Sequence, residues 1–146
     1  MADIVDPATR SRMMSGIRGS DTRPELQMRR ALHAYGFRFR LHDRRLPGRP
    51  DIVLPKWGAV IEVRGCFWHR HENCRFATTP STRPEFWSVK FAANVARDAR
   101  NLAALHADSW RVAVVWECAF RTGTIMSIMD RIIPWLEGDD DFAEIS

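Results

Sequence analysis

The sequence predicts an α/β fold in which a small mixed central sheet is flanked by helices. Strand-like segments, either uniformly apolar or alternating between apolar and polar residues, lie at 37–42, 51–54, 59–64 and 110–117. Longer amphipathic segments with helix-start signals lie before, between and after them. The 146 residues, 45% of them hydrophobic, suffice for one domain with a core, and no repeat or linker divides the chain. The expected order is one helix, three strands, a helix, a strand and a helix.

The first helix is expected to begin after Thr22. Thr22 is a suitable N-cap, Pro24 suits the first turn, and Glu25 would complete a capping box. The helix is expected to end at Gly36. In the following strand, 37–42, apolar residues alternate with Arg and His, so that one face is apolar and the other basic.

Turn signals separate the next two strands. The sequence LPGRP precedes the strand DIVL at 51–54, and the turn KWG leads into the strand AVIEVR at 59–64. Because both strands are short and joined by a tight turn, we expect them to form a hairpin.

A long helix is expected after the polar loop that follows residue 74. The sequence STRPEFW repeats the earlier helix-start signature, with Thr82 as the cap, Pro84 in the first turn and Glu85 completing the capping box. The apolar residues expected on the buried side of this helix are Phe86, Val89, Ala93, Ala96, Leu102 and Leu105.

The C-terminal part is expected to contain a buried strand at 110–117 and a last amphipathic helix at 124–137. Pro134 is expected to kink or end that helix, because proline lacks the amide hydrogen that a helix interior requires. The acidic end of the chain, 138–146, is expected to be flexible.

Basic charge is concentrated in the N-terminal part of the chain. The net charge is +4, and eleven Arg stand between Arg10 and Arg49 against three acidic residues. Such an Arg-rich half indicates phosphate contacts. Because Arg outnumbers Lys twenty to two, a solvated surface in an arginine-preferring genome is the alternative. No apolar stretch is long enough to span a membrane and no signal peptide is evident, so we expect an intracellular protein.

Asp51, Glu62 and Arg64 are expected to lie together in the hairpin. Strand alternation places Glu62 and Arg64 on one face, and pairing of the two strands brings Asp51 beside them. Two carboxylates at one place suit Mg²⁺, which prefers oxygen ligands. The arrangement resembles the PD-(D/E)xK nuclease pattern, with ten residues between Asp51 and Glu62 and Arg in place of Lys. The alternative is an ion pair between Glu62 and Arg64 on an exposed strand.

The proton acceptor of such a site must be another residue, because arginine stays protonated. His69 follows the strand closely, and a neutral imidazole there can take the proton of an attacking water. A structural histidine is the alternative.

Cys66, His71 and Cys74 have the spacing C-x4-H-x2-C, which suits a metal ion held by a tight loop. Cys118, at the end of the strand 110–117, is expected to supply the fourth ligand. Three thiolates and one imidazole indicate a closed, structural zinc site that ties this loop to that strand. The alternative is three ordinary buried cysteines and a surface histidine.

Six segments together resemble the very short patch repair (Vsr) endonuclease family. They are DPATRSRMMSGI, LPGRPD, GCFWHRH, TRPEFW, NVARD and WRVAVVWECA, and the resemblance extends from residue 3 to about residue 122. It implies a restriction-endonuclease-like core, a structural zinc ion and Mg²⁺-dependent, strand-specific nicking. Members of the family nick DNA 5′ to the thymine of a T:G mismatch that arises by deamination of 5-methylcytosine.

The resemblance also implies roles for individual residues. Asp51 is implied as the central Mg²⁺ ligand and the backbone carbonyl of Val63 as a second ligand. His69 is the implied general base, and Glu25 stands where the family has an acidic residue that reaches the site from the first helix. The four residues expected to bind zinc match the family's zinc ligands, although the spacing between His71 and Cys74 is one residue longer than in the best-known form.

The aromatic residues beside the zinc ligands receive a function from the same resemblance. It implies that Phe67, Trp68 and Trp87 form a wedge that enters the base stack beside the mismatch from the major groove. Met14, in an N-terminal DNA-contacting segment at 1–20, is implied to approach from the minor groove. Unstacking is least costly at a mismatch, so a wedge contributes discrimination. Burial of Phe67 and Trp68 beneath the zinc loop is the alternative.

The chain departs from the best-known family form at two positions of the strand 59–64. Arg64 stands where that form has His, and Glu62 where it has an apolar residue. Glu62 is therefore a candidate Mg²⁺ ligand, direct or through water, and Arg64 a candidate contact to the scissile phosphate. Two alternative functions follow: a Vsr-like nuclease with relaxed or restriction-type specificity, and a zinc-stabilised DNA-binding module without catalysis.

The expected partner is double-stranded DNA with a T:G mismatch. The mismatch-repair protein MutL is a family-level partner, although no feature of this sequence indicates the contact. We expect a cytoplasmic, nucleoid-associated monomer with no membrane association.

Overall fold

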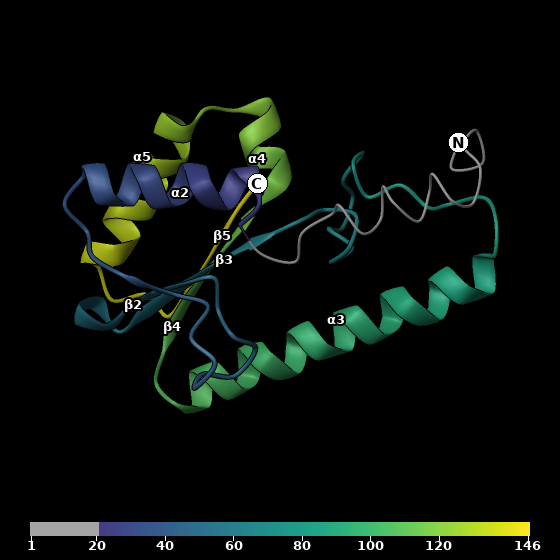
Figure 1. Ribbon diagram of the computed structural model, residues 1–146, viewed down its shortest axis with the longest axis horizontal. Coiled ribbons are helices and arrows are strands. Elements are labelled where there is room, and N and C mark those ends of the chain that lie inside the picture. Colours follow the sequence, from purple (N-terminus) through teal and green to yellow (C-terminus); the bar gives the residue numbers. More distant parts are fainter. Residues whose placement is uncertain (1–20) are drawn as a thin grey trace.

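The central element of the computed structural model, which describes residues 21–146, is one sheet of five strands in the order β1-β2-β3-β4-β5 (Figure 1). The segment 1–20, with Met14, lies outside the described residues. The strands are β1 (Arg40–Leu41), β2 (Ile52–Leu54), β3 (Ala59–Arg64), β4 (Arg111–Trp116) and β5 (Phe142–Ile145). Pairing is antiparallel from β1 to β3 and parallel from β3 to β5, so the predicted small mixed sheet is confirmed.

Helices cover both faces of this sheet. They are α2 (Arg23–Ala34), the short 3₁₀ helix η2 (Pro55–Trp57), α3 (Pro84–Ala107), α4 (Glu117–Thr122) and α5 (Ile125–Glu137). On one face, apolar side chains of α2 and α5 pack on alternate residues of the strands, including Ile52, Ile61 and Ala113. On the other face, Val60 and Val114 pack with Leu105 near the C-terminal end of α3. Within residues 21–146, none of the helices combines the length and the hydrophobicity that a membrane-spanning helix needs.

The predicted start of α2 is confirmed, with one change in the capping contacts. The hydroxyl of Thr22 accepts a hydrogen bond from the backbone amide of Glu25 at 3.4 Å. The carboxylate of Glu25 accepts from the amide of Asp21 at 3.0 Å, one residue before the cap. The first predicted strand is shorter than expected, because only Arg40 and Leu41 pair with β2.

Two expectations about α3 are wrong. The N-cap is Arg83, in a left-handed conformation with φ of 51° and without a side-chain capping bond, rather than Thr82. The N-terminal half of α3 is also largely exposed: Phe86 is 44% and Val89 72% exposed, and Ala93 and Ala96 are exposed as well. The reason is visible in Figure 1, where this half of α3 extends beyond the sheet and lies against the loop that follows β3.

The expectation of a flexible acidic end is wrong for residues 142–145. These residues form β5 and pair with β4, and Ile145 is buried against the core. The carboxylate of Glu144 accepts a hydrogen bond from the indole nitrogen of Trp116 at 2.7 Å. The alternation in FAEI is a strand signal that the neighbouring run of acids obscures. The last helix forms as α5, which continues through Pro134 to Glu137, so this proline does not end it.

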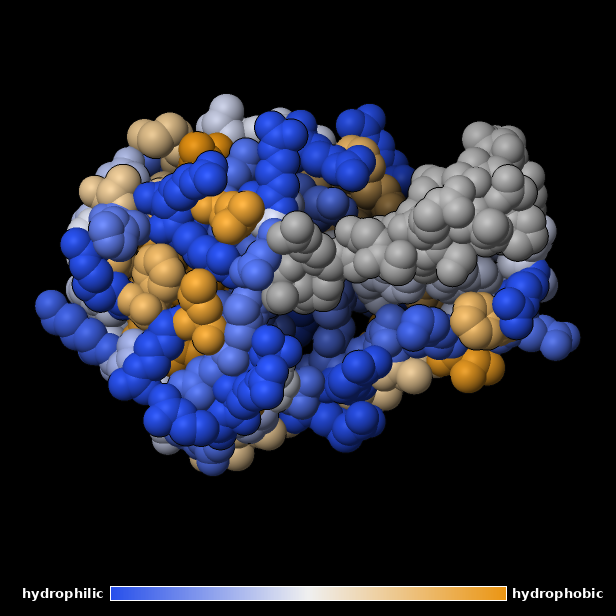
Figure 2. Space-filling view, in the orientation of Figure 1, coloured by the Kyte–Doolittle hydropathy of each residue, from blue (hydrophilic) through white to orange (hydrophobic). Residues whose placement is uncertain are grey.

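The outer surface is mainly hydrophilic in the view of Figure 2, with apolar residues exposed in scattered places. One of these places lies along the N-terminal half of α3, in agreement with the exposure of Phe86 and Val89.

Candidate active site

Asp51 is fixed at the end of β3, as the hairpin predicts. It precedes β2, and its Oδ2 accepts a hydrogen bond from the backbone amide of Val63 at 2.7 Å. Only 18% of the Asp51 side chain is exposed. A carboxylate is thereby held beside the last residues of the central antiparallel pair, at the point where the chain turns into the zinc loop, residues 65–79.

The surroundings of Asp51 disfavour its charged form. Burial is the largest cause, and the carboxylates of Glu25 and Glu62 add repulsion, while the Val63 amide acts in the opposite direction. Together they raise the pKa of Asp51 to about 7. A divalent cation would offset both burial and repulsion, so the donor set fits a hard metal ion.

Glu25 reaches the same region from α2 and is 2% exposed. Its Oε2 accepts from the Asp21 amide and, at 3.2 Å, from the Arg29 guanidinium. Both of these hydrogen bonds go to Oε2, so the capping contact does not itself use Oε1. The capping role and a role at the site are therefore compatible.

His42, which the sequence left without a role, connects Arg29 to Asp51. Arg29 Nη2 lies 3.0 Å from His42 Nε2, and His42 Nδ1 lies 3.8 Å from Asp51 Oδ1. Because a guanidinium can only donate, Nε2 must accept, and in the neutral ring the proton resides on Nδ1, facing Asp51. The signal that could have found His42 is its place in the polar face of the strand 37–42, next to the start of the hairpin.

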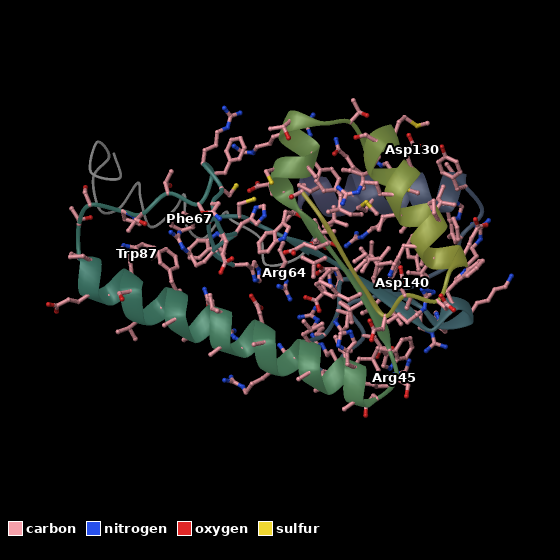
Figure 3. The ribbon with its side chains drawn as sticks, turned by 180° about the vertical axis from the view of Figure 1, so that it is seen from behind. Arg45, Arg64, Phe67, Trp87, Asp130 and Asp140 are labelled. Carbon is pink, nitrogen blue, oxygen red and sulfur yellow. The ribbon has the colours of Figure 1, made fainter. Side chains whose placement is uncertain are left out.

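Glu62 and Arg64 form the ion pair that strand alternation predicts, but they are not on an exposed strand. Nε and Nη2 of Arg64 both donate to Oε1 of Glu62, at 3.2 and 3.0 Å. Only 12% of the Arg64 side chain and 15% of the Glu62 side chain are exposed. The Arg64 guanidinium also lies 5.8 Å from the centre of the Trp116 ring. Figure 3 shows Arg64 at the end of the strand, on the side of α3.

His69 has a carboxylate partner that the sequence analysis missed. Its Nδ1 lies 2.7 Å from Oδ2 of Asp98 on α3. A hydrogen bond from Nδ1 to Asp98 fixes the tautomer and leaves Nε2 as a proton acceptor. Asp98 is the last residue of the segment NVARD, so the signal was present, but no local pattern connects it to a histidine in a distant loop.

The zinc-ligand set comes together as predicted. One ligand atom from each of Cys66, His71, Cys74 and Cys118 lies within 4.8 Å of the others. His71 Nδ1 is 3.7 Å from the sulfur of Cys66 and 3.5 Å from that of Cys118. Tetrahedral zinc with one thiolate and one imidazole ligand places those two atoms about 3.5 Å apart, so the donor set fits this ion. Burial raises the pKa of the Cys66 thiol to about 12, so metal binding must displace protons.

The second candidate metal cluster of the described residues is Asp21, Glu25 and His42. The Arg29 guanidinium already occupies this cluster, 2.6 Å from Asp21 and 3.2 Å from Glu25. Neither cluster contains the predicted Mg²⁺ ligands Asp51 and Glu62. The geometry therefore supports Asp51 as a metal ligand more strongly than Glu62, whose Oε1 is engaged by Arg64.

The three predicted wedge residues form one aromatic cluster with Phe91. Ring centres are 4.9 Å apart for Phe67 and Trp68, 5.7 Å for Phe67 and Trp87, and 6.0 Å for Trp68 and Trp87. All three are half-buried, while Phe91 beneath them is 8% exposed. Figure 3 shows Phe67 on the loop and Trp87 near the start of α3, on the sides of the two segments that face each other. Their partial exposure leaves aromatic surface available for contact with bases.

One face of α3 receives the loop that carries these residues. Asn94 donates from its side chain to the carbonyl of Trp68 at 3.1 Å, and Asp98 holds His69. Phe91 packs against Phe67 with ring centres 5.2 Å apart. Positions 91, 94 and 98 lie on one face of a helix. The same face thus positions both the aromatic cluster and the candidate general base.

Similarities to known proteins agree with this arrangement. Residues 2–75 match the family described as DNA mismatch endonuclease Vsr. The Type II nicking enzyme V.XorIIP of Xanthomonas oryzae pv. oryzae is 51% identical over 81% of this chain and 86% of its own length. The DNA mismatch endonuclease Vsr of Escherichia coli K12 is 42% identical over 99% of this chain and 94% of its own length. The Type II nicking enzyme V.NmeAIP of Neisseria meningitidis is 38% identical, over 86% and 89%.

Proposed function

Because the chain belongs to the family of Vsr DNA mismatch endonucleases, we propose that it nicks DNA 5′ to the thymine of a T:G mismatch left by deamination of 5-methylcytosine. It is a DNA endonuclease, which excludes the non-catalytic DNA-binding module. The observation that best supports the specific reaction is the position of the aromatic cluster. Phe67 and Trp68 directly precede His69, which is held by Asp98, and Asp51 is anchored to Val63 just before them.

We propose Mg²⁺ as the catalytic ion, held by Asp51 and the Val63 carbonyl, with Glu62 in contact directly or through water. When bound, the ion supplies positive charge to the scissile phosphate and the attacking water. The crowding of Asp51 with Glu25 and Glu62 supports a cation at this place. The core that holds these residues is proposed to be of the restriction-endonuclease type, with Asp51, Glu62 and Arg64 in the PD-(D/E)xK pattern.

The protein's own groups are proposed to divide the remaining work. His69 accepts the proton of the attacking water at Nε2, because Nδ1 is committed to Asp98. Arg64, held by Glu62, presents a guanidinium that binds a phosphate oxygen and stabilises its developing charge. Phe67, Trp68 and Trp87 enter the base stack beside the mismatch, and the zinc ion keeps their loop in place.

One observation favours the alternative of a restriction-type or relaxed specificity. Several relatives are named type II nicking enzymes, including the one that is 51% identical. A restriction-type or relaxed choice of site uses the same catalytic groups and differs in the sequence around the nick. A monomeric state, a cytoplasmic location and an association with MutL stay predictions.

The test of the proposed site is replacement of Asp51 by Asn, which keeps the side-chain shape and removes the charge. We expect Mg²⁺-dependent nicking to fall by about 10³-fold or more, because a neutral amide cannot replace the metal-binding carboxylate. Zinc content and binding to mismatched DNA should be retained. Asp43→Asn, in the neighbouring loop, is the matched control and should leave nicking unchanged. Full nicking activity in the Asp51→Asn variant would refute this assignment.

A further inference from the structure

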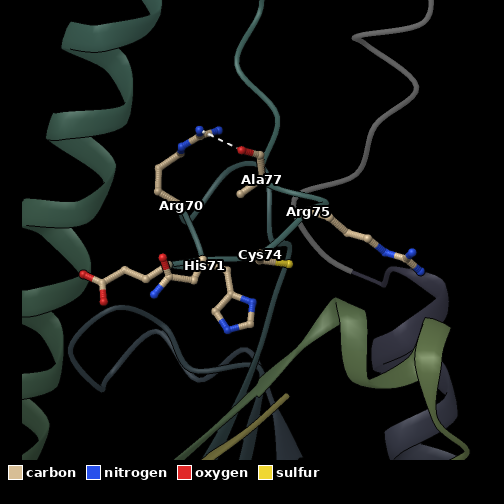
Figure 4. A pocket seen from close by; sticks show the side chains of 7 residues that line it. Arg70, His71, Cys74, Arg75 and Ala77 are labelled. Atoms are coloured by element: carbon tan, nitrogen blue, oxygen red, sulfur yellow. Dashed lines mark hydrogen bonds between the residues drawn. The ribbon is translucent and has the colours of Figure 1, made fainter.

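Arg70 makes more contacts than the zinc site requires of a residue between two ligands. Its Nη1 donates to the carbonyls of Phe67 and Thr78, at 3.2 and 2.8 Å. Its Nη2 donates to the carbonyl of Ala77 and the hydroxyl of Thr79, at 3.0 and 3.1 Å. Figure 4 shows the side chain reaching across the loop to Ala77. One guanidinium thus joins the start of the zinc loop to its end.

The same guanidinium also contacts α3 and the aromatic cluster. It lies 4.0 Å from the centre of the Phe91 ring and 5.7 Å from that of Phe67. A cation over an aromatic face is attracted by the ring, and a planar guanidinium does so while its edge donates hydrogen bonds. Arg70 therefore connects three parts: the backbone of Phe67, the segment 77–79 and the buried aromatic residue of α3.

These connections are separate from those that zinc supplies. The metal ligands Cys66 and His71 fix the ends of the short segment that holds Phe67 and Trp68, and Cys74 fixes the middle of the loop. Neither the segment 77–79 nor α3 provides a ligand to this cluster. Without Arg70, the loop would keep the metal ligands Cys66 and His71 but lose the bond to the Phe67 carbonyl and the guanidinium between the Phe67 and Phe91 rings. Ring contacts and the Asn94 bond to Trp68 would then be left to orient the two rings against α3.

We infer that Arg70 is a positioning residue for recognition of the mismatch: it holds Phe67 and Trp68 in the orientation in which they enter the base stack. The inference rests on the proposed function of the aromatic cluster. Inserting side chains into a base stack costs free energy, and a loosely held loop would be displaced before the bases are unstacked. The backbone at Arg70 has φ of +53°, so the chain turns sharply here and directs the side chain back across the loop.

Two replacements separate this role from a simple phosphate contact. Arg70→Gln removes the charge and most donors, while Arg70→Lys keeps the charge but loses the planar fork. We expect both variants to lose about tenfold in affinity for a T:G duplex, with less than about twofold change for a fully paired duplex. Fluorescence of 2-aminopurine beside the mismatch should report less unstacking. Zinc content should remain at one per chain, which excludes unfolding as the cause.

Arg75→Gln is the matched control, because Arg75 is an exposed arginine of the same loop that lies over Phe76. It should leave the preference for mismatched DNA unchanged. Hydrogen–deuterium exchange of free protein adds a readout without DNA: residues 66–79 should exchange faster in Arg70→Gln than in the wild type or the control.

The outcomes are distinguishable. Restoration of selectivity by Lys would overturn the role of the guanidinium fork and indicate a charge effect alone. If the wild type prefers the T:G duplex and Arg70→Gln keeps the same preference, the inference is overturned and the proposed function stands. A wild type that binds both duplexes equally would overturn the proposed function and, with it, the role of Arg70 in recognition.

Discussion

At the scale of single residues, Asp51 combines a proposed role in metal binding with an environment that disfavours its charge. Its carboxylate is largely buried, near Glu25 and Glu62, and its pKa is raised to about 7. A group of this kind destabilises the folded protein whenever it is charged and no cation is bound. Such a cost is typical of active sites, where residues are placed for chemistry and not for stability.

The stability of the Asp51→Asn variant tests this account. The unfolded chain releases the Asp51 proton near the ordinary pKa of 3.8 and the folded chain near 7, so the free energy of unfolding falls as the pH rises between these values. Because Asn cannot ionise, we expect the variant to be more stable than the wild type at pH 8 without Mg²⁺, on the order of 1–3 kcal/mol. The difference should disappear towards pH 4, as measured by urea unfolding at both pH values.

Asp43→Asn is the control, because the pKa of Asp43 is shifted in the opposite direction to that of Asp51. The Arg45 guanidinium holds the pKa of Asp43 at about 2, so its replacement is expected to bring no stabilisation at pH 8. A difference between Asp51→Asn and wild type that is the same at pH 4 and pH 8 would contradict the electrostatic cause and indicate a packing effect.

At the scale of elements, the candidate zinc ligands come from two places. Three of them lie in the loop after β3, and Cys118 lies in α4, directly after β4. The ring of His71 stacks on Trp116 with centres 4.2 Å apart, which adds an apolar contact to the same junction. The loop contains no helix or strand of its own, so the proposed zinc ion and Arg70 would replace the contacts that regular structure would supply.

Cys118→Ser should therefore lower zinc content and stability, whereas Asp51→Asn should lower nicking activity and keep the zinc. We expect loss of stoichiometric zinc and a lower melting temperature, because a serine hydroxyl is a poor zinc ligand and three ligands leave the ion open to exchange. Metal analysis after gel filtration and thermal unfolding with and without a chelator measure both effects. Glu117→Gln, on the same helix, removes the surface ion pair with Arg121 while Arg121 stays over the Phe76 ring, and should change neither. Full zinc content in Cys118→Ser would refute the four-ligand site.

The sequence predicted correctly those elements that are determined by residues close to one another in the chain. The bounds of β3 and the cap of α2 follow from alternation and from Thr22, and both agree with the structure. The exposure of Phe86 and Val89 could not be predicted, because it depends on how far α3 extends past the sheet. β5 was missed because acidic residues dominate the end of the chain, although Ile145 follows the strand pattern.

The same distinction applies to the candidate site. Residues close in sequence, such as the zinc ligands of the loop or Glu62 with Arg64, were found from their spacing. His42 and Asp98 were not, because their partners Asp51 and His69 lie on other elements and only the fold brings them together.

At the scale of the whole molecule, the mixed sheet brings three candidate functional groups to one end of β3. The antiparallel pair β2–β3 places Asp51 there, the loop beyond β3 carries the aromatic cluster and His69, and the parallel neighbour β4 leads to Cys118, the fourth candidate zinc ligand. α3 spans this end, with Leu105 in the core and Phe91, Asn94 and Asp98 against the loop. Mismatch recognition and strand cleavage are thus proposed to share one rigid support.

The most direct test of the central claim is nicking of end-labelled duplexes that carry T:G, other mismatches or none, in several flanking sequences with Mg²⁺. The account predicts a nick 5′ to the mismatched thymine, with a rate for T:G at least about 10²-fold above that for paired DNA, because unstacking at a mismatch is less costly. Cleavage of fully paired DNA at the same rate would favour a Vsr-like nuclease with relaxed or restriction-type specificity. Equal cleavage of paired and mismatched DNA would contradict the claim that this enzyme recognises mismatches.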